Sequence, residues 1–572
     1  MNTSPNWHFT RSGHLPLEEP TSVAVFDSIE YEAVCEEPLP ADVNPYTDLR
    51  FSLILDRIER TPPSHFYRST ATPWPAILRI EGFCDGDDGT LRLRFMPDAP
   101  GMFAGTLLIH HGETLLGEQA VTIQATDSMN HGPVWVDPEY PWHFVFEGTG
   151  NHFFYNGTTA YFLLGWNEAE FESILDRLAY SGVNRIRVAL SGRVESAMAW
   201  HEPVYASEKF SFRLNPWQSE RPDDLEPGWD VTRFNPAFWF KVDWLVYCAR
   251  ERGIVVSVVF YVDGYRPGVD PFGKENAGGP DEKRFYAYAA ARLSAFPNIM
   301  WDIANEYRLF RDEAWVREMA PFLQSVDPNR HPVSVHGHGD FRFHADVWPD
   351  FALFQSWDEW GGYAFMRKNR ELQAATGRIM PQVNEEYGYE DHYPQGWGDN
   401  RVAPARDAES RRRLAWEIYM AGGYQTTGER AVGADGEQFG GWVNGNGSDN
   451  STEMLTGYNY IRRFFEEFEW WQTNPDDSVV HPDNKGWCLS EPGKQYAVYF
   501  ADMTENGTAP REPGAIRLML AAGRYEARWY YPPTGAFAAP FSVTAEAAVW
   551  SALPSTPFTR NGVDGALLLT RS

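Results

Sequence analysis

The stretch from Ile299 to Tyr307 reads IMWDIANEY, and it changes character partway along its length. Its first part, Ile299–Ala304, is mostly apolar, which predicts a short buried strand. Asn305 and Glu306 follow, so an amide and a carboxyl group stand directly at the end of this strand. In a (β/α)8 barrel the active site lies at the C-terminal ends of the strands, so these two side chains are predicted to face a reaction site.

A second stretch, Ile379 to Tyr389, reads IMPQVNEEYGY and has the same arrangement. Ile379–Asn384 is predicted to form a strand, and Glu385 and Glu386 follow it. Glu386 lies 80 residues after Glu306, about the length of three strand–helix units. The two stretches therefore predict two carboxyl groups at the same end of one barrel.

Strand-like and helical runs alternate from about residue 150 to about residue 470, which is typical of βαβ units. The predicted strands are Tyr161–Asn167, Arg185–Leu190, Ile254–Tyr261, Ile299–Ala304, His331–His336, Phe351–Gln355, Ile379–Asn384 and Gly423–Thr427. Eight such strands predict an α/β fold of the (β/α)8 TIM-barrel type with insertions. A doubly wound sheet is the rival, but no glycine fingerprint follows the first predicted strand.

Both ends of the chain have a different texture, with short β-rich runs separated by turn residues. Residues 1–142 predict an N-terminal β-sandwich of immunoglobulin type, as in the period-two run Leu91–Phe95. Residues 143–474 are assigned to the catalytic barrel. Residues 475–572 predict a smaller C-terminal β-sandwich, with strands such as Gln495–Phe500 and Tyr525–Tyr531.

Composition limits the classes of partner. Hydrophobic residues make up 43% and charged residues 22% of the 572 residues, as in an ordinary folded protein, and the net charge of −30 disfavours a nucleic acid partner. No apolar run approaches about 18 residues, so no membrane span is predicted. The start of the chain lacks the pattern of a secretory signal. The four scattered cysteines show no metal-binding spacing, and together these features favour free thiols and a cytoplasmic location.

Hydrolysis of a glycosidic bond requires two carboxyl groups on either side of that bond. One must be protonated so that it can release the leaving oxygen, and the other must be ionised so that it can attack or stabilise the anomeric carbon. Glu306 and Glu386, on opposite sides of a barrel mouth, are predicted to supply this pair. The aromatic share of 15%, with 23 Trp, fits large cores and also fits rings that stack on sugars.

The two motifs together resemble the large clan of retaining glycosidases built on (β/α)8 barrels. Asn305-Glu306 matches the clan's acid/base pair, and Glu386-Tyr387-Gly388 matches its nucleophile motif. The three-part layout also resembles bacterial proteins assigned to the glycosidases, and the stretch Gly89–Gly105 is similar to their N-terminal domain. The resemblance implies that Glu306 is the acid/base, that Glu386 is the nucleophile, and that Asn305 holds a substrate hydroxyl.

Two points remain open beside this resemblance. Glu385 and Glu386 are neighbours on a strand and would face opposite ways, so one of them is expected to meet Glu306, and the aromatic-glycine context selects Glu386. Arg187, in the second predicted strand, is a candidate to bond the nucleophile carboxylate, as an arginine does in this clan. A structural salt bridge is the alternative, and Arg185 shares the face of Arg187.

Other polar and aromatic residues follow the predicted strands and are candidates for substrate contact. These are Asp263 after the third strand, His336 and His338 after the fifth, Trp357 after the sixth, and Trp442 after the eighth. The H-x-H pair could instead bind a metal with a carboxylate, or simply pack. The other three could equally serve loop structure.

The sequence therefore predicts a retaining glycoside hydrolase that acts on small oligosaccharides or glycosides and needs no metal or other cofactor. A metal-dependent sugar isomerase or hydrolase that uses His336 and His338 is one alternative, and a non-catalytic carbohydrate-binding protein is another. The oligomeric state stays open, and a homo-oligomer is compatible with the sequence.

Overall fold

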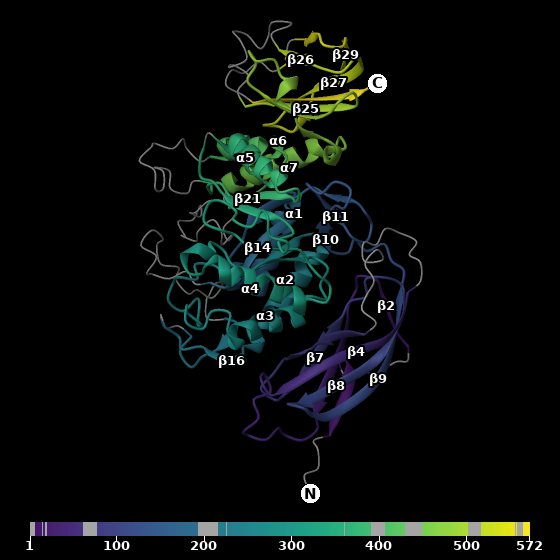
Figure 1. Cartoon of the computed structure of the whole chain (residues 1–572), viewed down its shortest axis with the longest axis vertical. Helices are drawn as coiled ribbons and strands as arrows, with labels where there is room; N and C mark the ends of the chain where they lie inside the picture. Colours follow the sequence, from purple (N-terminus) through teal and green to yellow (C-terminus); the bar gives the residue numbers. More distant parts are fainter. Residues whose placement is uncertain are drawn as a thin grey trace.

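The computed structural model places three layered regions in a row along the long axis of the molecule (Figure 1). Antiparallel strands β4, β7, β8 and β9 lie near the N-terminus, a barrel with helices around it fills the middle, and a second set of strands holds the C-terminus. The structure describes residues 6–13, 15–17, 20–60, 77–192, 215–222, 224, 226–359, 361–390, 407–428, 449–501, 516–554, 556–557 and 564–572.

The central sheet has eight parallel strands in the order β19-β18-β17-β14-β13-β22-β21-β20. Their bounds are β13 Asn156–Thr159, β14 Arg185–Ser191, β17 Val255–Tyr261, β18 Ile299–Asp302, β19 Val333–Ser334, β20 Ala352–Gln355, β21 Gln382–Glu386 and β22 Tyr424–Thr427. A parallel bridge between His336 and Leu353 joins the two ends of this order. The sheet therefore closes on itself, and the predicted (β/α)8 barrel is confirmed.

The seam between β19 and β20 is reinforced by side chains. The Ser334 hydroxyl donates to the Phe351 carbonyl at 2.6 Å, and the Val333 amide donates to the Asp350 carboxylate at 2.9 Å. Both bonds satisfy backbone groups that a longer strand would have paired, which is why two very short strands suffice to complete the ring.

Helices lie between most consecutive strands of the barrel and after the last one, and they cover its outside (Figure 1). They are α1 Glu168–Tyr180, α2 Pro236–Glu251, α3 Pro280–Leu293, α4 Glu313–Val326, α5 Gly362–Ala375, α6 Ala408–Met420 and α7 Asp449–Phe465. Three begin at a residue whose side chain accepts a backbone N–H of the first turn, namely Asn167, Asp312 and Asp407. Such N-caps satisfy amides that have no partner inside the helix.

The first barrel strand differs from the prediction. The expected strand at Tyr161–Asn167 is a turn followed by the short 3-10 helix Leu163–Gly165, and the strand is β13, which ends before it. β13 has the sequence NGTT, which carries little strand propensity. It is a strand because β14 and β22 pair with it on both sides, and its side chains are all buried.

The N-terminal region consists of two sheets that share one core. One has the order β1-β3-β7-β6 and the other β2-β9-β8-β4-β5. The strands are β1 Trp7–Arg11, β2 Thr21–Ala24, β3 Ile29–Cys35, β4 Leu49–Arg60, β5 Leu78–Glu81, β6 Phe83–Cys84, β7 Leu91–Phe95, β8 Gly101–His111 and β9 Thr114–Thr126. In β7 the leucines and Phe95 are buried and the arginines between them are half-buried, as the period-two pattern predicts.

Residues 134–153 form a small antiparallel sheet. Its strands are β10 Val134–Val136, β11 Phe144–Phe146 and β12 His152–Phe153. His143 precedes β11, and its ring bonds the Tyr424 hydroxyl of β22 at 2.7 Å. The sheet thus packs on the N-terminal end of the barrel. A hairpin of β15 Trp217–Gln218 and β16 Asp230–Phe234 lies within the insertion before α2.

The C-terminal region is again built from antiparallel strands. Its main sheet has the order β23-β24-β25-β31-β27-β28, with β29 also paired to β27, and β26 pairs with β30. The strands are β23 Asn474–Pro475, β24 Trp487–Glu491, β25 Gln495–Phe500, β26 Arg517–Met519, β27 Gly523–Tyr531, β28 Ala536–Phe537, β29 Phe541–Ala545, β30 Trp550–Ala552 and β31 Gly565–Arg571.

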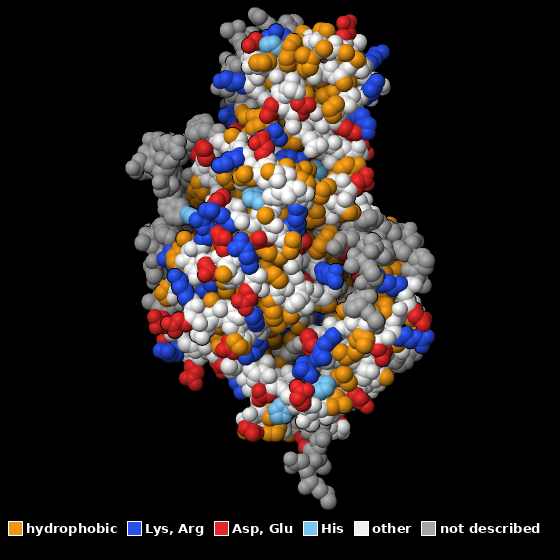
Figure 2. Space-filling view, in the orientation of Figure 1, with side chains coloured by type: hydrophobic (Ala, Val, Ile, Leu, Met, Phe, Trp, Pro, Cys, Tyr) orange, Lys and Arg blue, Asp and Glu red, His pale blue; other side chains and the backbone are white. Residues whose placement is uncertain are grey.

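Two further features concern the distribution of surface charge and the character of the helices. Acidic and basic side chains are interspersed over the face drawn in Figure 2, so the net charge of −30 is not gathered into one acidic patch there. Among the described residues, no helix combines the length and the apolar character that a membrane crossing requires.

Candidate active site

Two carboxyl-bearing residues at the mouth of the barrel have an unusual backbone. Glu306 follows β18 with φ of +47°, and Asp263 follows β17 with φ of +56°. Left-handed backbone at a residue with a side chain costs on the order of 1–3 kcal/mol and is concentrated at functional sites. Both residues lie at C-terminal strand ends, where the active site of a barrel is expected.

Glu386 ends β21 and lies within electrostatic reach of Glu306. Burial, and next the negative charge of Glu306, raise the pKa of Glu386 well above its ordinary value, while Arg187 acts in the opposite direction. Asp263 adds to the repulsion. The structure thus brings the two sequence-predicted glutamates together, and burial with the charge of Glu306 favours the protonated form of Glu386.

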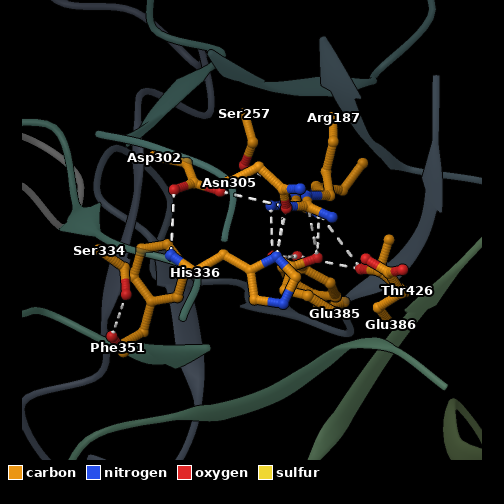
Figure 3. A network of polar contacts seen from close by, with 12 residues as sticks. Arg187, Ser257, Asp302, Asn305, Ser334, His336, Phe351, Glu385, Glu386 and Thr426 are labelled. Carbon is orange, nitrogen blue, oxygen red and sulfur yellow. Dashed lines mark hydrogen bonds and ion pairs between the residues drawn. The ribbon is translucent and has the colours of Figure 1, made fainter. Parts of the chain in front are cut away.

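Glu385 points to a different set of partners from Glu386. Its carboxylate accepts bonds from Arg185 at 2.7 and 2.8 Å, and the Tyr155 hydroxyl lies at 3.3 Å. Figure 3 shows Glu385 below the side chain of Arg187. Burial opposes ionisation, but Arg185 and Arg187 outweigh it, so the pKa of Glu385 is lowered.

A register shift explains how two adjacent glutamates both serve the barrel interior. Phe354 of β20 faces Asn384, but the next residue, Gln355, faces Glu386, so Glu385 has no partner across the strand pair. Such a bulge re-aims side chains next to active sites. Strict alternation of side chains, the basis of the sequence argument, does not hold here.

Arg187 is the centre of a buried polar network at the base of the site (Figure 3). Its guanidinium donates to the Tyr161 hydroxyl at 2.5 Å, to Asn305 Oδ1 at 2.8 Å and to Asp302 at 3.3 Å. Its ion pair with a glutamate goes to Glu385, at 3.5 Å. The expected direct bond from Arg187 to the carboxylate of Glu386 is therefore corrected: Arg187 influences Glu386 through its charge.

Asn305 and His336 belong to the same network and are both buried. Asn305 Oδ1 accepts from the Tyr161 hydroxyl at 2.9 Å and is in close contact with His336 Nδ1. Burial and the neighbouring Arg187 keep the pKa of His336 well below its ordinary value, so the ring is neutral. His336 Nε2 is buried and has no hydrogen-bond partner among the described residues.

His338 does not share the contacts of His336 and lies instead beside Glu306. Its Nδ1 lies 2.8 Å from Glu306 Oε1, and its side chain is 51% exposed. That bond, more than any other influence, raises the pKa of His338. In the part of the chain that the structure describes, no group of three or more His, Cys, Asp or Glu side chains is arranged to hold a metal ion.

The remaining predicted residues are less closely tied to the centre. Burial, followed by the charge of Glu306, raises the pKa of Asp263 to about 7. The half-buried Trp357 lies edge-on to Tyr389, with ring centroids 5.8 Å apart. Trp442 lies outside the described residues.

Sequence reasoning missed Tyr161, Asp302 and Tyr389. Tyr161 was predicted to begin a strand, although it lies after the strand β13 and bonds Asn305. Asp302 sits in WDIANE and Tyr389 in EYGY, so each lies within four residues of a predicted catalytic residue, and that nearness was the available signal. Tyr389 hydrogen-bonds Glu386 and opposes the rise in its pKa.

Comparison with known proteins agrees with this geometry. Residues 142–472 match the family described as "Apiosidase-like, catalytic domain". A search of curated proteins found no match.

Two solved structures from Bacteroides vulgatus ATCC 8482 share the fold. One, assigned provisionally to the glycoside hydrolases, is 19% identical and covers 96% of this chain and 100% of its own length, with a TM-score of 0.68. The other, a glycoside hydrolase of family 5, is 18% identical and covers 77% of this chain and 94% of its own length, with a TM-score of 0.58.

Proposed function

The chain belongs to the family of apiosidase-like catalytic domains and is a glycoside hydrolase, and from that premise we propose a retaining enzyme that acts on small oligosaccharides or glycosides by double displacement. The observation that carries this proposal is the convergence of Glu306 and Glu386 at one end of the barrel. The two side chains are close enough that the charge of Glu306 raises the pKa of Glu386. Glu306 is the acid/base and Glu386 the nucleophile.

The raised pKa of Glu386 favours its protonated form in the free enzyme, so this proton must pass to Glu306 before the reaction begins. In the first step, a carboxylate oxygen of Glu386 attacks the anomeric carbon and the bond to the leaving oxygen breaks. Glu306 gives its proton to that oxygen, and a glycosyl-enzyme ester remains. In the second step, Glu306 takes a proton from water, the water oxygen attacks the anomeric carbon, and Glu386 is released as a carboxylate. Glu306 has then regained the proton that it gave to the leaving group.

The substrate-binding roles are part of the proposal. Asn305 Oδ1 is already engaged by Tyr161 and Arg187, so a sugar hydroxyl would accept from the amide nitrogen of Asn305. The buried Nε2 of His336 is an acceptor that a hydroxyl could satisfy. Asp263, Trp357 and Trp442 complete the set, and Arg187 positions Asn305 and His336.

The family's name makes a terminal apiosyl residue the first substrate to test. We also propose a cytoplasmic location, which the unpaired state of all four cysteines supports.

A panel of 4-nitrophenyl glycosides that includes the apioside tests the activity, and proton NMR of the first-formed sugar tests retention of the anomeric configuration. Glu386→Gln and Glu306→Gln should each lower kcat on the 4-nitrophenyl substrate about 1000-fold or more while the fold survives. Glu318→Gln, on the outer face of α4 and paired with Lys283, is the matched control. An inverted product, or wild-type turnover in either active-site variant, would contradict the proposal.

A further inference from the structure

We propose that His338 is a positioning residue for the acid/base Glu306: its Nδ1–H holds one carboxyl oxygen, so that the proton destined for the leaving group resides on the other. This inference rests on the proposed function, because it takes Glu306 as the acid/base. It gives His338 a task different from the sugar contact that the sequence suggested.

The contact between His338 and Glu306 gives the two carboxyl oxygens of Glu306 different roles. Nδ1 of His338 lies 2.8 Å from Glu306 Oε1, a normal length for a charge-assisted bond. When Nδ1 carries hydrogen, Oε1 must act as the acceptor, and an acidic proton on Glu306 must then sit on Oε2. The bond to the Glu306 carboxylate raises the pKa of His338, so the ring holds hydrogen on Nδ1 most firmly once Glu306 has given up its proton.

The backbone around His338 is fixed from two sides. Arg308, from the loop that carries Glu306, donates to the His338 carbonyl at 3.1 Å and pairs with Asp340 at 3.1 Å. From the other side, the Gln355 amide donates to the Gly339 carbonyl at 2.9 Å. These bonds hold the loop after β19 against the loop after β18, so the ring of His338 is held near Glu306 by more than its own bond.

The interaction also grows stronger as the reaction proceeds. Glu306 becomes negatively charged as it releases its proton, and a hydrogen bond donated to a carboxylate is stronger than one donated to a neutral carboxyl group. His338 therefore stabilises the transition state of the first step more than the ground state. Asp263 has the opposite effect, because its charge and that of Glu306 repel each other.

Leaving groups of different basicity test this role. The probes are phenyl, 4-nitrophenyl and 2,4-dinitrophenyl glycosides of the sugar with the highest turnover in the panel above. Because 2,4-dinitrophenolate leaves without acid assistance and phenolate does not, loss of acid catalysis should appear mainly with the phenyl glycoside. His338→Ala should lower kcat/KM about 100-fold for the phenyl glycoside and less than about threefold for the dinitrophenyl glycoside.

Two further variants make the test specific. His338→Asn keeps an N–H donor near the position of Nδ1 and should recover most of the activity on the phenyl glycoside, whereas His338→Leu keeps bulk without a donor and should behave like His338→Ala. His344→Asn is the matched control, since His344 belongs to the same segment but bonds Gln373 at 2.7 Å. It should keep the wild-type dependence on the leaving group.

The outcomes separate this inference from the proposed function. A loss in His338→Ala and His338→Leu that is equal for all three leaving groups, or no loss, overturns the positioning role. Glu306→Ala should itself show a steep dependence on the leaving group. If kcat/KM depends steeply on the leaving group in Glu306→Ala but not in the His338 variants, this inference fails alone. If kcat/KM does not depend on the leaving group in Glu306→Ala either, the acid/base assignment of Glu306 fails as well.

Discussion

At the scale of single residues, the site concentrates features that a stable protein would avoid. Asp263 and Glu306 both have left-handed backbone, and Asp263 is a half-buried acid whose pKa is raised to about 7. Each feature raises the free energy of the folded state, and both occur where carboxyl groups must lie close together. Stability has thus been given up at the positions that would carry the chemistry.

Asp263→Asn should therefore stabilise the protein. The pKa of Asp263 is about 7 in the folded state and near 3.8 when unfolded, so the unfolded chain loses its proton first as the pH rises. The wild type should lose stability between pH 4 and pH 7, and the asparagine variant should escape that loss. We expect a difference on the order of 2 kcal/mol at pH 7.5 that vanishes near pH 3.5.

Chemical denaturation of both proteins at several pH values measures this difference. The same substitution should lower turnover, because an amide cannot accept two sugar hydroxyls as a carboxylate can. A gain in stability that does not vary with pH would contradict the explanation.

At the scale of elements, the strands with a clear sequence pattern were predicted correctly. The strand that forms only because its neighbours pair with it was missed. The fully buried strands β14 and β17 were found because both are rich in β-branched and apolar residues, although two arginines interrupt β14 and a serine interrupts β17. β13 was missed because its NGTT sequence gives no signal, while the apolar run after it gave a false one. Tertiary pairing overrides local propensity there.

The same distinction applies to the site. Glu306 and Glu386 were located from their place after two strands, a signal that lies within the sequence. The pairing of Glu385 with Arg185 depends on the register shift against β20, which no local pattern reports. The bond from His338 to Glu306 depends on how two loops meet, so it too was out of reach.

Glu385 and Glu386 provide a matched pair of variants for this bulge. Glu385→Gln should cost about 3 kcal/mol of unfolding free energy, because it leaves the fully buried Arg185 without its counter-ion. Glu386→Gln should cost little or even stabilise, because the raised pKa of Glu386 means that its charge is unfavourable in the folded state. Urea unfolding at pH 7 measures both, and a larger loss in Glu386→Gln would reverse the assignments.

At the scale of the whole molecule, ionic and aromatic contacts bind the flanking sheets to the barrel. The Asp243 carboxylate of α2 forms ion pairs with Arg94 of β7 and Arg292 of α3, each at 2.8 Å. At the other end, Trp416 of α6 stacks on Tyr499 of β25 with centroids 4.7 Å apart and an interplanar angle of 2°. The barrel helices thus share buried contacts with both sheet regions.

Asp243→Ala tests the N-terminal junction. It leaves two nearly buried guanidinium groups beside each other, and we expect a loss of about 3–5 kcal/mol. Asp281→Ala, which removes an exposed pair with Arg284 in α3, is the control and should cost less than about 1 kcal/mol. Calorimetric melting of the full chain measures both, and losses of similar size would show that the junction contributes no more than the surface.

The ring of the barrel closes between β19 and β20 through few backbone bonds. Among the described residues, β19 and β20 are joined by the isolated bridge between His336 and Leu353 and by a bond from the Asp350 amide to the Val333 carbonyl, whereas β14 and β17 share a ladder along their length. The weakly paired part of the ring borders the loop that carries His338. There the bonds from Arg308 to the His338 carbonyl and from Gln355 to the Gly339 carbonyl take the place of a longer ladder. The loops beside the acid/base therefore also help to close the barrel.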